Sequence, residues 1–435
     1  MPESSEAIEC DAGDASPAAL ASLPDEALLE AVQRQTFRFF WDGAHPVSAL
    51  ASDVIPRRSH HPADLVAIGG SGFGVMAHIV AVERGWVSRE EALRRLDRML
   101  DLLLRATCYH GAFPHFMDGR TGATIPFMRK DDGADLVETS LLIMGLLCAR
   151  QYFQRDDRSE RALRDRISYL WDEIEWTWFT RDGRDVLYWH WSPNNGWAMN
   201  HEIRGWNECL ITYVLAAGSR RHAIEPAVYQ RGFAGGRHYL NGRSYYGIEL
   251  PLGPAYGGPL FFAHYSFCGL DPRGLKDHCA DYWQQNVRHV QINRAHCIAN
   301  PNGHKGYGPS CWGLTASDDP DGYEAHAPAV DNGTISPTAA LSSLPYAPAD
   351  AMQVLRHLLS THGSRVWGRY GFFDAFCERR DWSARTCLAI DQGPIIIMME
   401  NHRSGLLWKL FMSAPEVQSG LRRLGFTSSR MDAGG

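Results

Sequence analysis

The sequence has no Cys-x-x-Cys pair among its ten cysteines. Zinc ribbons and thioredoxin-like redox sites depend on such pairs, so both kinds of site are disfavoured. Several cysteines instead lie in apolar helical runs, for example Cys148 in LLIMGLLCAR and Cys209 in NECLITYVL. We expect these thiols to be small buried side chains in a protein of a reducing compartment.

Long apolar runs and an excess of positive charge are missing as well. No stretch approaches the ~20 apolar residues that a membrane-spanning helix needs. The 43 Lys and Arg are outnumbered by 50 Asp and Glu, and the net charge is −7, so there is no basic footprint for nucleic acid or an anionic membrane. We therefore expect neither nucleic acid nor a membrane as a partner. The sequence leaves the oligomeric state open.

The start of the chain lacks what an export signal requires. A secretory signal has a positively charged first region and an apolar core. Here the first 25 residues are acidic and rich in Ala, Ser and Pro, and no basic residue precedes Arg34. We expect residues 1–24 to be a disordered acidic tail. The expected location is the cytoplasm, or the periplasm if a leader has been removed.

Several catalytic motifs are absent. His201-Glu202 is not followed by a histidine at position 205, so there is no zincin motif. Ser71 lies in GGSGFG, which has neither the spacing of a nucleophile elbow nor the length of a dinucleotide fingerprint. The acids between 319 and 324 do not fit an EF-hand loop, and the nineteen histidines show no clear metal-ligand spacing. We therefore expect no cofactor and no metal.

Helical periodicity dominates from residue 25 onward. Ser88 and Glu91 form a capping box ahead of a leucine stripe, and similar patterns recur along the chain. Together they predict twelve helices: 25–41, 72–84, 88–106, 135–153, 158–179, 205–217, 225–235, 259–267, 273–297, 337–344, 348–362 and 392–412. The links between them alternate between short ones and long ones rich in Gly, Pro, Asp, His and Trp.

Six helix pairs with alternating links predict an all-α fold, an (α/α)6 toroid that occupies residues 25–435 as a single domain. The long loops would then form one active-site face above the N-termini of the inner, even-numbered helices. An α-solenoid is the alternative, but the sequence shows no fixed-period repeat.

Acidic residues gather where three of these predicted helices begin. Asp131, Asp135 and Glu138 surround the start of the helix at 135–153. Glu208 falls in the first turn of the helix at 205–217, and Asp391 directly precedes the last one. Each acid could simply cap its helix or complement the helix dipole. Because these helix starts face the loop-built end, the same acids could supply the two carboxyl groups of a glycoside hydrolase.

Aromatic residues are concentrated just ahead of Glu208. Seven of the 14 tryptophans lie between residues 171 and 206. Trp176 and Trp178 follow a helical pattern and are expected in the core. The run YWHWSPNNGW at 188–197 lies in a loop, where its rings would suit the flat faces of sugars and would favour a protonated Glu208. A small hydrophobic cluster under the loop is the alternative.

These stretches resemble the glucoamylase-like family that includes glycoside hydrolase family 144, the β-1,2-glucanases. The resemblance runs from about residue 36 to residue 426. Among the segments that carry it are FRFFWDGAHP, KDDGADLVETSLLIMGLL, LYWHWSPNNGW, IRGWNECLITYVLA and AIDQGPIIIMMENHRSGLLWKLFM. It implies an (α/α)6 barrel, an oligo- or polysaccharide substrate, and hydrolysis of β-1,2-glucan with inversion at the anomeric carbon.

The resemblance also implies roles for individual residues. The catalytic candidates are Asp131, Asp135, Glu138, Glu208 and Asp391. We expect Glu208 to be the general acid, and Asp135, Glu138 or Asp391 to activate water directly or through a water chain. The predicted substrate contacts are His115, Trp189, His190, Trp191, Asn194, Trp197, Arg204, Asn207, Tyr265, Trp312 and Gln392.

The leading hypothesis is an endo-acting β-1,2-glucanase. The alternatives are an exo-acting relative that releases the disaccharide sophorose and a transglycosylase. A non-catalytic sugar-binding protein is disfavoured, because binding alone would not require paired carboxyl groups. A sugar epimerase on the same toroid is disfavoured because such enzymes depend on histidine bases, whereas here acids occupy the helix starts.

Overall fold

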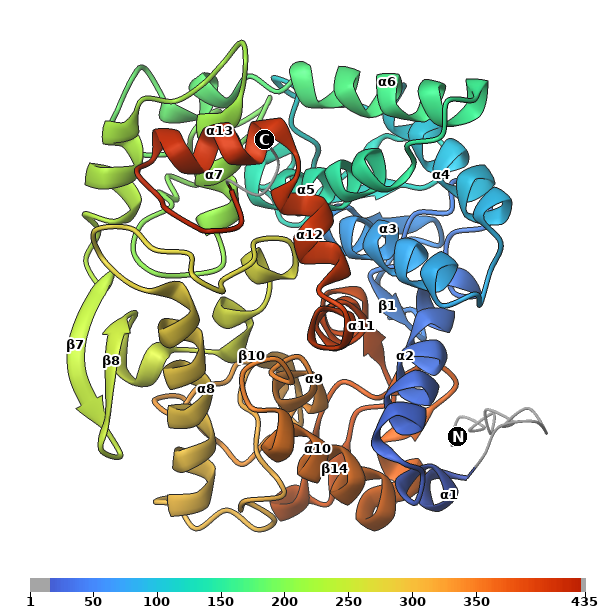
Figure 1. Ribbon diagram of the computed structural model, residues 1–435, viewed down its shortest axis with the longest axis vertical. Helices are drawn as coiled ribbons and strands as arrows, with labels where there is room; N and C mark the ends of the chain where they lie inside the picture. Colours follow the sequence, from blue (N-terminus) through green and yellow to red (C-terminus); the bar gives the residue numbers. More distant parts are fainter. Residues whose placement is uncertain (1–15, 432–435) are drawn as a thin grey trace.

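The computed structural model describes residues 16–431, and the predicted (α/α)6 toroid is confirmed (Figure 1). The inner ring consists of α3 (Ile68–Glu83), α5 (Leu136–Tyr152), α7 (Leu210–Gly218), 3-10 turns within 260–268, α9 (Pro337–Leu341) and α11 (Ala389–Arg403). The outer ring consists of α2 (Asp25–Trp41), α4 (Arg89–Leu103), α6 (Arg158–Asp172), a π-turn at Val228–Phe233, α8 (Tyr282–Ala299) and α10 (Pro348–His357).

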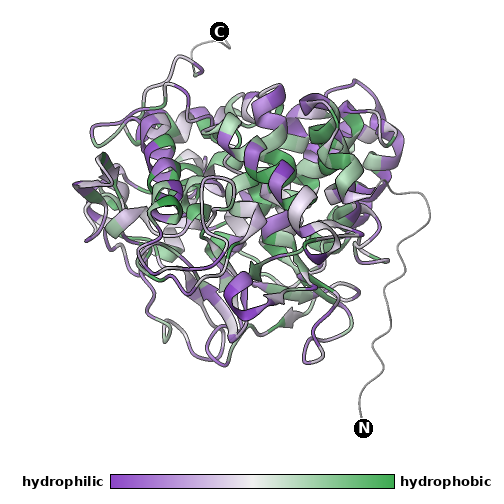
Figure 2. Cartoon of the chain, turned by 90° about the horizontal axis from the view of Figure 1, so that it is seen from below, coloured by the Kyte–Doolittle hydropathy of each residue, from purple (hydrophilic) through white to green (hydrophobic). Residues whose placement is uncertain are grey.

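Burial distinguishes the two rings. α3 is buried from Ile68 to Ala81 and α5 from Leu136 to Arg150, which matches their apolar composition on all sides. The outer helices α4 and α6 bury only one stripe each, and their other faces are charged. Figure 2 shows the same division, with apolar segments inside and hydrophilic residues on the outer helices.

The two most apolar inner helices touch through their backbones. A Cβ atom built on Gly145 of α5 would lie 2.1 Å from the carbonyl oxygen of Gly72 on α3. One built on Gly72 would lie 2.2 Å from the carbonyl oxygen of Leu141. No side chain fits in either position, so this close approach requires glycine. The GGSGFG sequence therefore serves helix packing.

Within residues 16–431, fifteen short strands join the loops. They are β1 (Val54–Ile55), β2 (Leu65–Ala67), β3 (Phe116–Asp118), β4 (Thr124–Ile125), β5 (Ala134–Asp135), β6 (His190–Trp191), β7 (Leu240–Tyr245), β8 (Ile248–Leu252), β9 (Ala316–Asp319), β10 (Gly322–Ala325), β11 (Trp367–Gly368), β12 (Gly371–Phe372), β13 (Phe376–Cys377), β14 (Trp382–Ser383) and β15 (Cys387–Leu388). The antiparallel pairs β1–β15 and β5–β6 join different loops directly ahead of α11 and α5. They fix the places where these helices begin.

Some predicted boundaries were wrong. The predicted tail 1–24 contains α1 (Pro17–Ala21), which Ser16 caps and whose Leu20 joins the core; residues 1–15 lie outside the described residues. The predicted helix at 273–297 begins only at Tyr282, where Asp281 caps it. The predicted helix at 392–412 is two helices, α11 and α12 (Leu406–Met412), separated at Gly405 with φ 70°. The sequence analysis also missed α13 (Pro415–Arg423).

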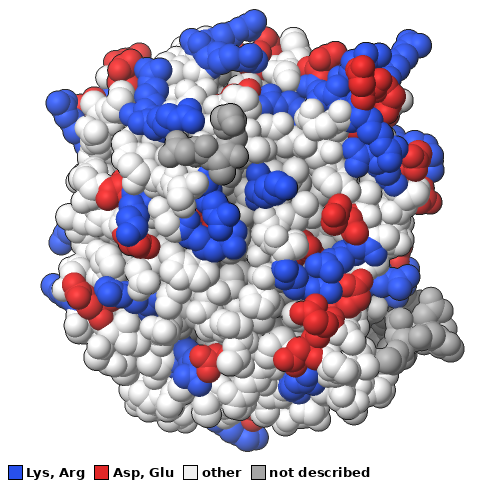
Figure 3. Space-filling view, in the orientation of Figure 1, with Lys and Arg blue, Asp and Glu red and all other residues white. Residues whose placement is uncertain are grey.

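The two cysteines predicted to be buried in helical runs are buried. Cys148 and Cys209 are buried, and the nine cysteines of residues 16–431 are all free thiols. Acidic and basic side chains are interspersed over the face drawn in Figure 3. No helix within 16–431 is long and apolar enough to cross a bilayer.

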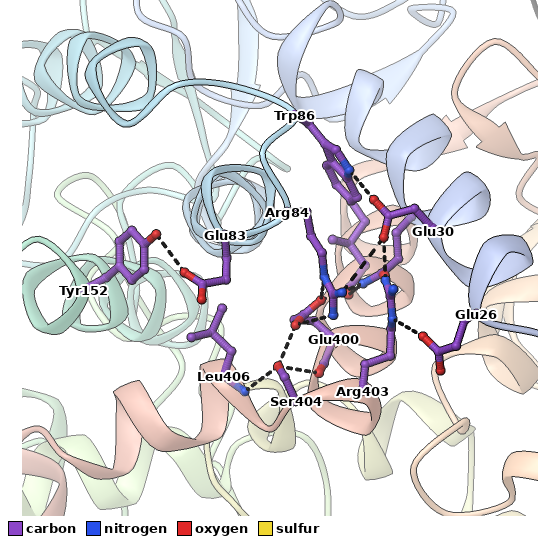
Figure 4. A network of polar contacts seen from close by, with 12 residues as sticks. Glu26, Glu30, Glu83, Arg84, Trp86, Tyr152, Glu400, Arg403, Ser404 and Leu406 are labelled. Atoms are coloured by element: carbon purple, nitrogen blue, oxygen red, sulfur yellow. Dashed lines mark hydrogen bonds and ion pairs between the residues drawn. The ribbon is translucent and has the colours of Figure 1, made fainter.

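A buried ion pair joins the C-terminal ends of α3 and α11. The carboxylate of Glu400, which is 0% exposed, accepts two 2.8 Å hydrogen bonds from the guanidinium of Arg84. Ser404 donates to the same carboxylate at 2.5 Å. Arg403 extends the network to Glu30 on the outer helix α2 at 3.0 Å (Figure 4).

Arg84→Ala is expected to lower the free energy of unfolding by about 3–5 kcal/mol, because it leaves the Glu400 charge buried without its partner. Urea unfolding followed by circular dichroism measures this change. Arg34→Ala, at an exposed position on α2, is the matched control and should change stability by no more than about 0.5 kcal/mol. A loss below about 1 kcal/mol for Arg84→Ala would contradict the role of this pair.

Candidate active site

Four predicted acids converge beside the starts of α5 and α7. Asp135 is the N-cap of α5, Glu138 lies in its first turn, and Glu208 lies two residues before Leu210, where α7 begins. Burial, followed by the charges of Glu138 and Asp135, raises the pKa of Glu208, so these three carboxyl groups are electrostatic neighbours. The charge of Asp135 likewise contributes to the pKa of Asp131.

Asp135 is fully buried and uses both of its oxygens. Oδ1 accepts the backbone N–H groups of Val137 and Glu138 at 3.0 and 2.9 Å, as an N-cap does. Oδ2 lies 3.0 Å from His115 Nδ1 and 3.5 Å from His190 Nε2. Strand β6 places His190 directly opposite Asp135 in the β5–β6 pair.

These contacts keep Asp135 ionised. Burial opposes its ionisation, but the hydrogen bonds to His115 and His190 outweigh it and hold the pKa of Asp135 below the ordinary range. Burial tends to lower the pKa of His115, yet the charges of Glu138, Asp135 and Asp131 raise it to about 10. At neutral pH Asp135 is therefore a fixed negative charge that orients two imidazole rings.

Glu138 lies three residues after the N-cap Asp135, but its side chain does not bond back to the backbone N–H of Asp135, which the carbonyl oxygen of Phe113 accepts. Its Oε2 instead accepts the backbone N–H of Gly69, at the start of α3, at 2.7 Å. Burial raises the pKa of Glu138 to about 7, although the charge of His115 and the Gly69 hydrogen bond oppose this shift. Glu138 therefore changes protonation state in the neutral range.

Glu208 lies in the turn before α7 rather than in the first turn of the helix. The hydroxyl of Ser266 donates to its carbonyl oxygen, and the same hydroxyl accepts the N–H of Ile211, so the turn is fixed against the 3-10 segment. The side chain is half-buried. Burial raises the pKa of Glu208 to about 7, and a protonated carboxyl group next to the ionised Asp135 is a suitable proton donor.

Asp391 belongs to a second acidic group. It lies in the first turn of α11, where Leu388 is the N-cap, so the predicted capping role was wrong. Burial, the charge of Asp374 and a hydrogen bond with Asp374 hold the pKa of Asp391 well above its ordinary value. Burial and then the charges of Asp391, Glu208 and Glu138 raise the pKa of the Tyr265 hydroxyl. Tyr265 therefore lies close enough to interact electrostatically with both acidic groups.

Three members of this second group were missed by the sequence analysis: Asp53, Asp318 and Asp374. Asp374 Oδ2 accepts the N–H of Asp318 at 2.6 Å. The carboxylate of Asp318 in turn binds Arg58 at 2.5 Å and Thr386 at 2.6 Å. These acids come from three loops that are distant in the sequence, so no spacing pattern could have indicated them.

The aromatic loop forms a stacked, partly exposed cluster. Trp178 is 39% exposed, so its predicted place in the core was wrong, whereas Trp176 is buried as predicted. The ring of His110 stacks on Trp178 with centroids 3.7 Å apart, and Trp191 packs edge-on against both. The rings pack on one another and also leave surface open to solvent. The loop therefore has features of a small hydrophobic cluster and of a surface for sugar rings.

The predicted substrate contacts differ in how far they are exposed. Six of them are half-buried near the acids or the aromatic loop: His115, Trp189, His190, Trp191, Trp197 and Asn207. Two are exposed, Asn194 and Arg204. Tyr265 is almost buried. Trp312 and Gln392 are buried. Trp312 is 0% exposed inside the core, and Gln392 donates its amide to the Phe372 carbonyl at 2.6 Å, so neither presents a surface to a sugar.

Comparisons with known proteins identify close relatives. The family model described as "Putative glucoamylase" matches residues 200–415. An exo β-1,2-glucooligosaccharide sophorohydrolase (non-reducing end) of Parabacteroides distasonis is 44% identical over 423 residues. The match covers 92% of this chain and 58% of that protein, so the chain spans less than two thirds of its length.

Two crystal structures match over their whole length. The endo-β-1,2-glucanase of Chitinophaga pinensis, solved with sophorotriose and glucose, is 51% identical with a TM-score of 0.92. A protein of Bacteroides uniformis described as a putative glucoamylase is 56% identical, also with a TM-score of 0.92. Each alignment covers 94% of this chain and 100% of the other.

Proposed function

Because this chain belongs to the glucoamylase-like family, which includes β-1,2-glucanases, we propose that it is a glycoside hydrolase that cleaves β-1,2-glucan. The observation that carries the proposal is the placement of Glu208 beside Glu138, each with a pKa of about 7. Glycoside hydrolysis requires two carboxyl groups at the scissile bond, one protonated and one charged. Two neighbouring acids that titrate near neutrality supply both forms.

We assign the general acid to Glu208 and the activation of water to Glu138. Asp135 is a poor base, because both of its oxygens already accept hydrogen bonds and its pKa is depressed. Asp391 is a poor base for the opposite reason, since the pKa that Asp374 helps to raise keeps it protonated. Glu138 commits one oxygen to Gly69 and is 9% exposed. A complex with an oligosaccharide should place the two carboxyl groups roughly 6.5–9.5 Å apart if the enzyme inverts.

We propose endo action as the leading mode. It is supported by the similarity to the Chitinophaga pinensis endo-β-1,2-glucanase along that enzyme's whole chain. The sophorohydrolase of Parabacteroides distasonis supports exo release of a disaccharide as the second candidate. Early products from linear β-1,2-glucan distinguish them, because a ladder of lengths indicates endo cleavage and disaccharide alone indicates exo cleavage.

The pH dependence follows from the two assigned carboxyl groups. Glu138 must be ionised and Glu208 protonated, and both have a pKa of about 7. We therefore expect kcat/KM to follow a narrow bell centred near pH 7, falling on the acid side as Glu138 takes up a proton and on the alkaline side as Glu208 loses one. Initial rates on a soluble β-1,2-glucan across the pH range test this. A profile that stays flat from about pH 5 to about pH 9 would refute the assignment.

A further inference from the structure

We propose that Cys311, His357, His362 and Glu378 form a structural zinc site at the edge of the loop-built face. The four residues come from different segments. Cys311 lies in the loop after α8, His357 ends α10, His362 ends the following π-turn, and Glu378 opens a 3-10 turn. The sequence analysis predicted no metal, because the spacing of these residues matches no known ligand pattern.

The geometry brings the donor atoms of Cys311, His357 and His362 together, and Glu378 lies beside His362. One donor atom each from Cys311, His357 and His362 lies within 4.8 Å of the others. The Oε1 of Glu378 lies 3.5 Å from the Nε2 of His362. The two imidazole rings are 5.4 Å apart and nearly perpendicular, so both can direct a nitrogen toward one point.

One of the ligands has a buried nitrogen that no protein group in the described part of the chain satisfies by a hydrogen bond. The side chain of His362 is 6% exposed, and within residues 16–431 its Nε2 has no hydrogen-bond partner. A buried nitrogen without a partner is unfavourable, and a metal ion would satisfy it. The Nδ1 of His357 is held by Thr361 at 3.2 Å, which leaves Nε2 as the free donor. Cys311 is 2% exposed.

The chemistry of the ligands favours zinc. One thiolate and two imidazoles, with the Glu378 carboxylate next to one of the rings, are ligand types that Zn²⁺ prefers, and if Glu378 supplies the fourth ligand no position is left open for catalysis.

Two other clusters with possible ligands lack this combination. His115, Asp131 and Asp135 are accounted for by their ion pairs in the candidate active site. Asp277, His278 and Cys279 are consecutive residues, and His278 is exposed. A metal at Cys311 would instead join the loops that carry Asp318 and Asp374, because Cys311 and Glu378 belong to the same two loops.

The test is the zinc content of the full-length protein. After removal of metal with a chelator and titration with Zn²⁺, the wild type should bind one zinc per chain with a Kd below about 1 µM. At 100 times the Kd, zinc should raise the Tm by about 3 °C. Cys311→Ser and His362→Ala should lose both effects. His278→Ala and Cys387→Ser are the matched controls, from the exposed cluster and from a buried thiol outside it, and should keep both.

Cobalt provides a second readout that needs no variant to fold. Co²⁺ added to the metal-free wild type should give the absorption of a tetrahedral cobalt–thiolate site, and Zn²⁺ should abolish it. Glu378→Gln should weaken zinc binding at least tenfold while the thiolate absorption persists. The proposal is overturned if the wild type binds no stoichiometric zinc, or if Cys311→Ser binds it as tightly as the wild type does. None of these readouts depends on the proposed hydrolase activity.

Discussion

Glu208→Gln is expected to lower kcat on linear β-1,2-glucan by about 10²–10⁴-fold, with little change in sugar affinity. The amide keeps the size of the side chain but cannot deliver a proton to the departing glycosidic oxygen. Because burial already favours the neutral form of Glu208, a neutral glutamine should fit the same place without loss of stability. Steady-state rates and the affinity for a short β-1,2-glucan measure both effects.

Glu225→Gln is the matched control for this substitution. Glu208 lies just before α7, and Glu225 lies shortly after the same helix. The carboxylate of Glu225 pairs with Arg423 at 3.3 Å. This variant should keep wild-type turnover. A Glu208→Gln enzyme within tenfold of the wild type would eliminate Glu208 as the general acid.

Glu138→Gln is expected to have an effect of similar size, again about 10²–10⁴-fold on kcat, because water would no longer be activated. Azide distinguishes the loss of the base in Glu138→Gln from the loss of the acid in Glu208→Gln. As an anion it needs no deprotonation: its nitrogen forms a bond to the anomeric carbon while the glycosidic bond breaks and Glu208 protonates the leaving oxygen. Azide should therefore restore turnover to Glu138→Gln, with a glycosyl azide as the product, and should leave Glu208→Gln inactive.

Asp391→Asn is the comparison that tests the choice of base. In the arrangement described here Asp391 shares a proton with Asp374, so the amide replaces a group that is already neutral. We expect no azide-dependent product from this variant. Azide rescue of Asp391→Asn, together with none for Glu138→Gln, would move the role of the base from Glu138 to Asp391.

The sequence predicted most of the helices, and exceptions arise where tertiary contacts decide the helix boundaries. α2 and α5 begin and end within a residue or so of their predicted places, because the apolar periodicity marks both helices and Asp135 caps α5. α3 starts four residues earlier than predicted, since glycines that usually break a helix are required here by contact with α5. Local patterns contain no information about such tertiary contacts.

The same distinction applies to the candidate site. Asp131, Asp135 and Glu138 share one short segment, so their proximity follows from the sequence. The contacts that set the pKa values of the acids do not follow from the sequence. Gly69, which binds Glu138, lies on another helix, and Asp374, which helps to raise the pKa of Asp391, lies in the irregular loop ahead of α11. The residue types of the site could therefore be predicted from the sequence, but the protonation states of the acids could be inferred only from the three-dimensional structure.

The backbone contact between α3 and α5 has a consequence for how this scaffold can diversify. Glu138 stands on one of these helices and is held by an amide of the other, and neither helix can shift while Gly72 and Gly145 touch. The position of this acid is thus set by the rigid centre of the toroid and by the β5–β6 pair, through which His190 and Trp191 anchor the start of α5. Descendants of this protein can change the exposed tip of the aromatic loop, at Asn194 and Asn195, to accept different sugar lengths while inheriting the acid in the same place.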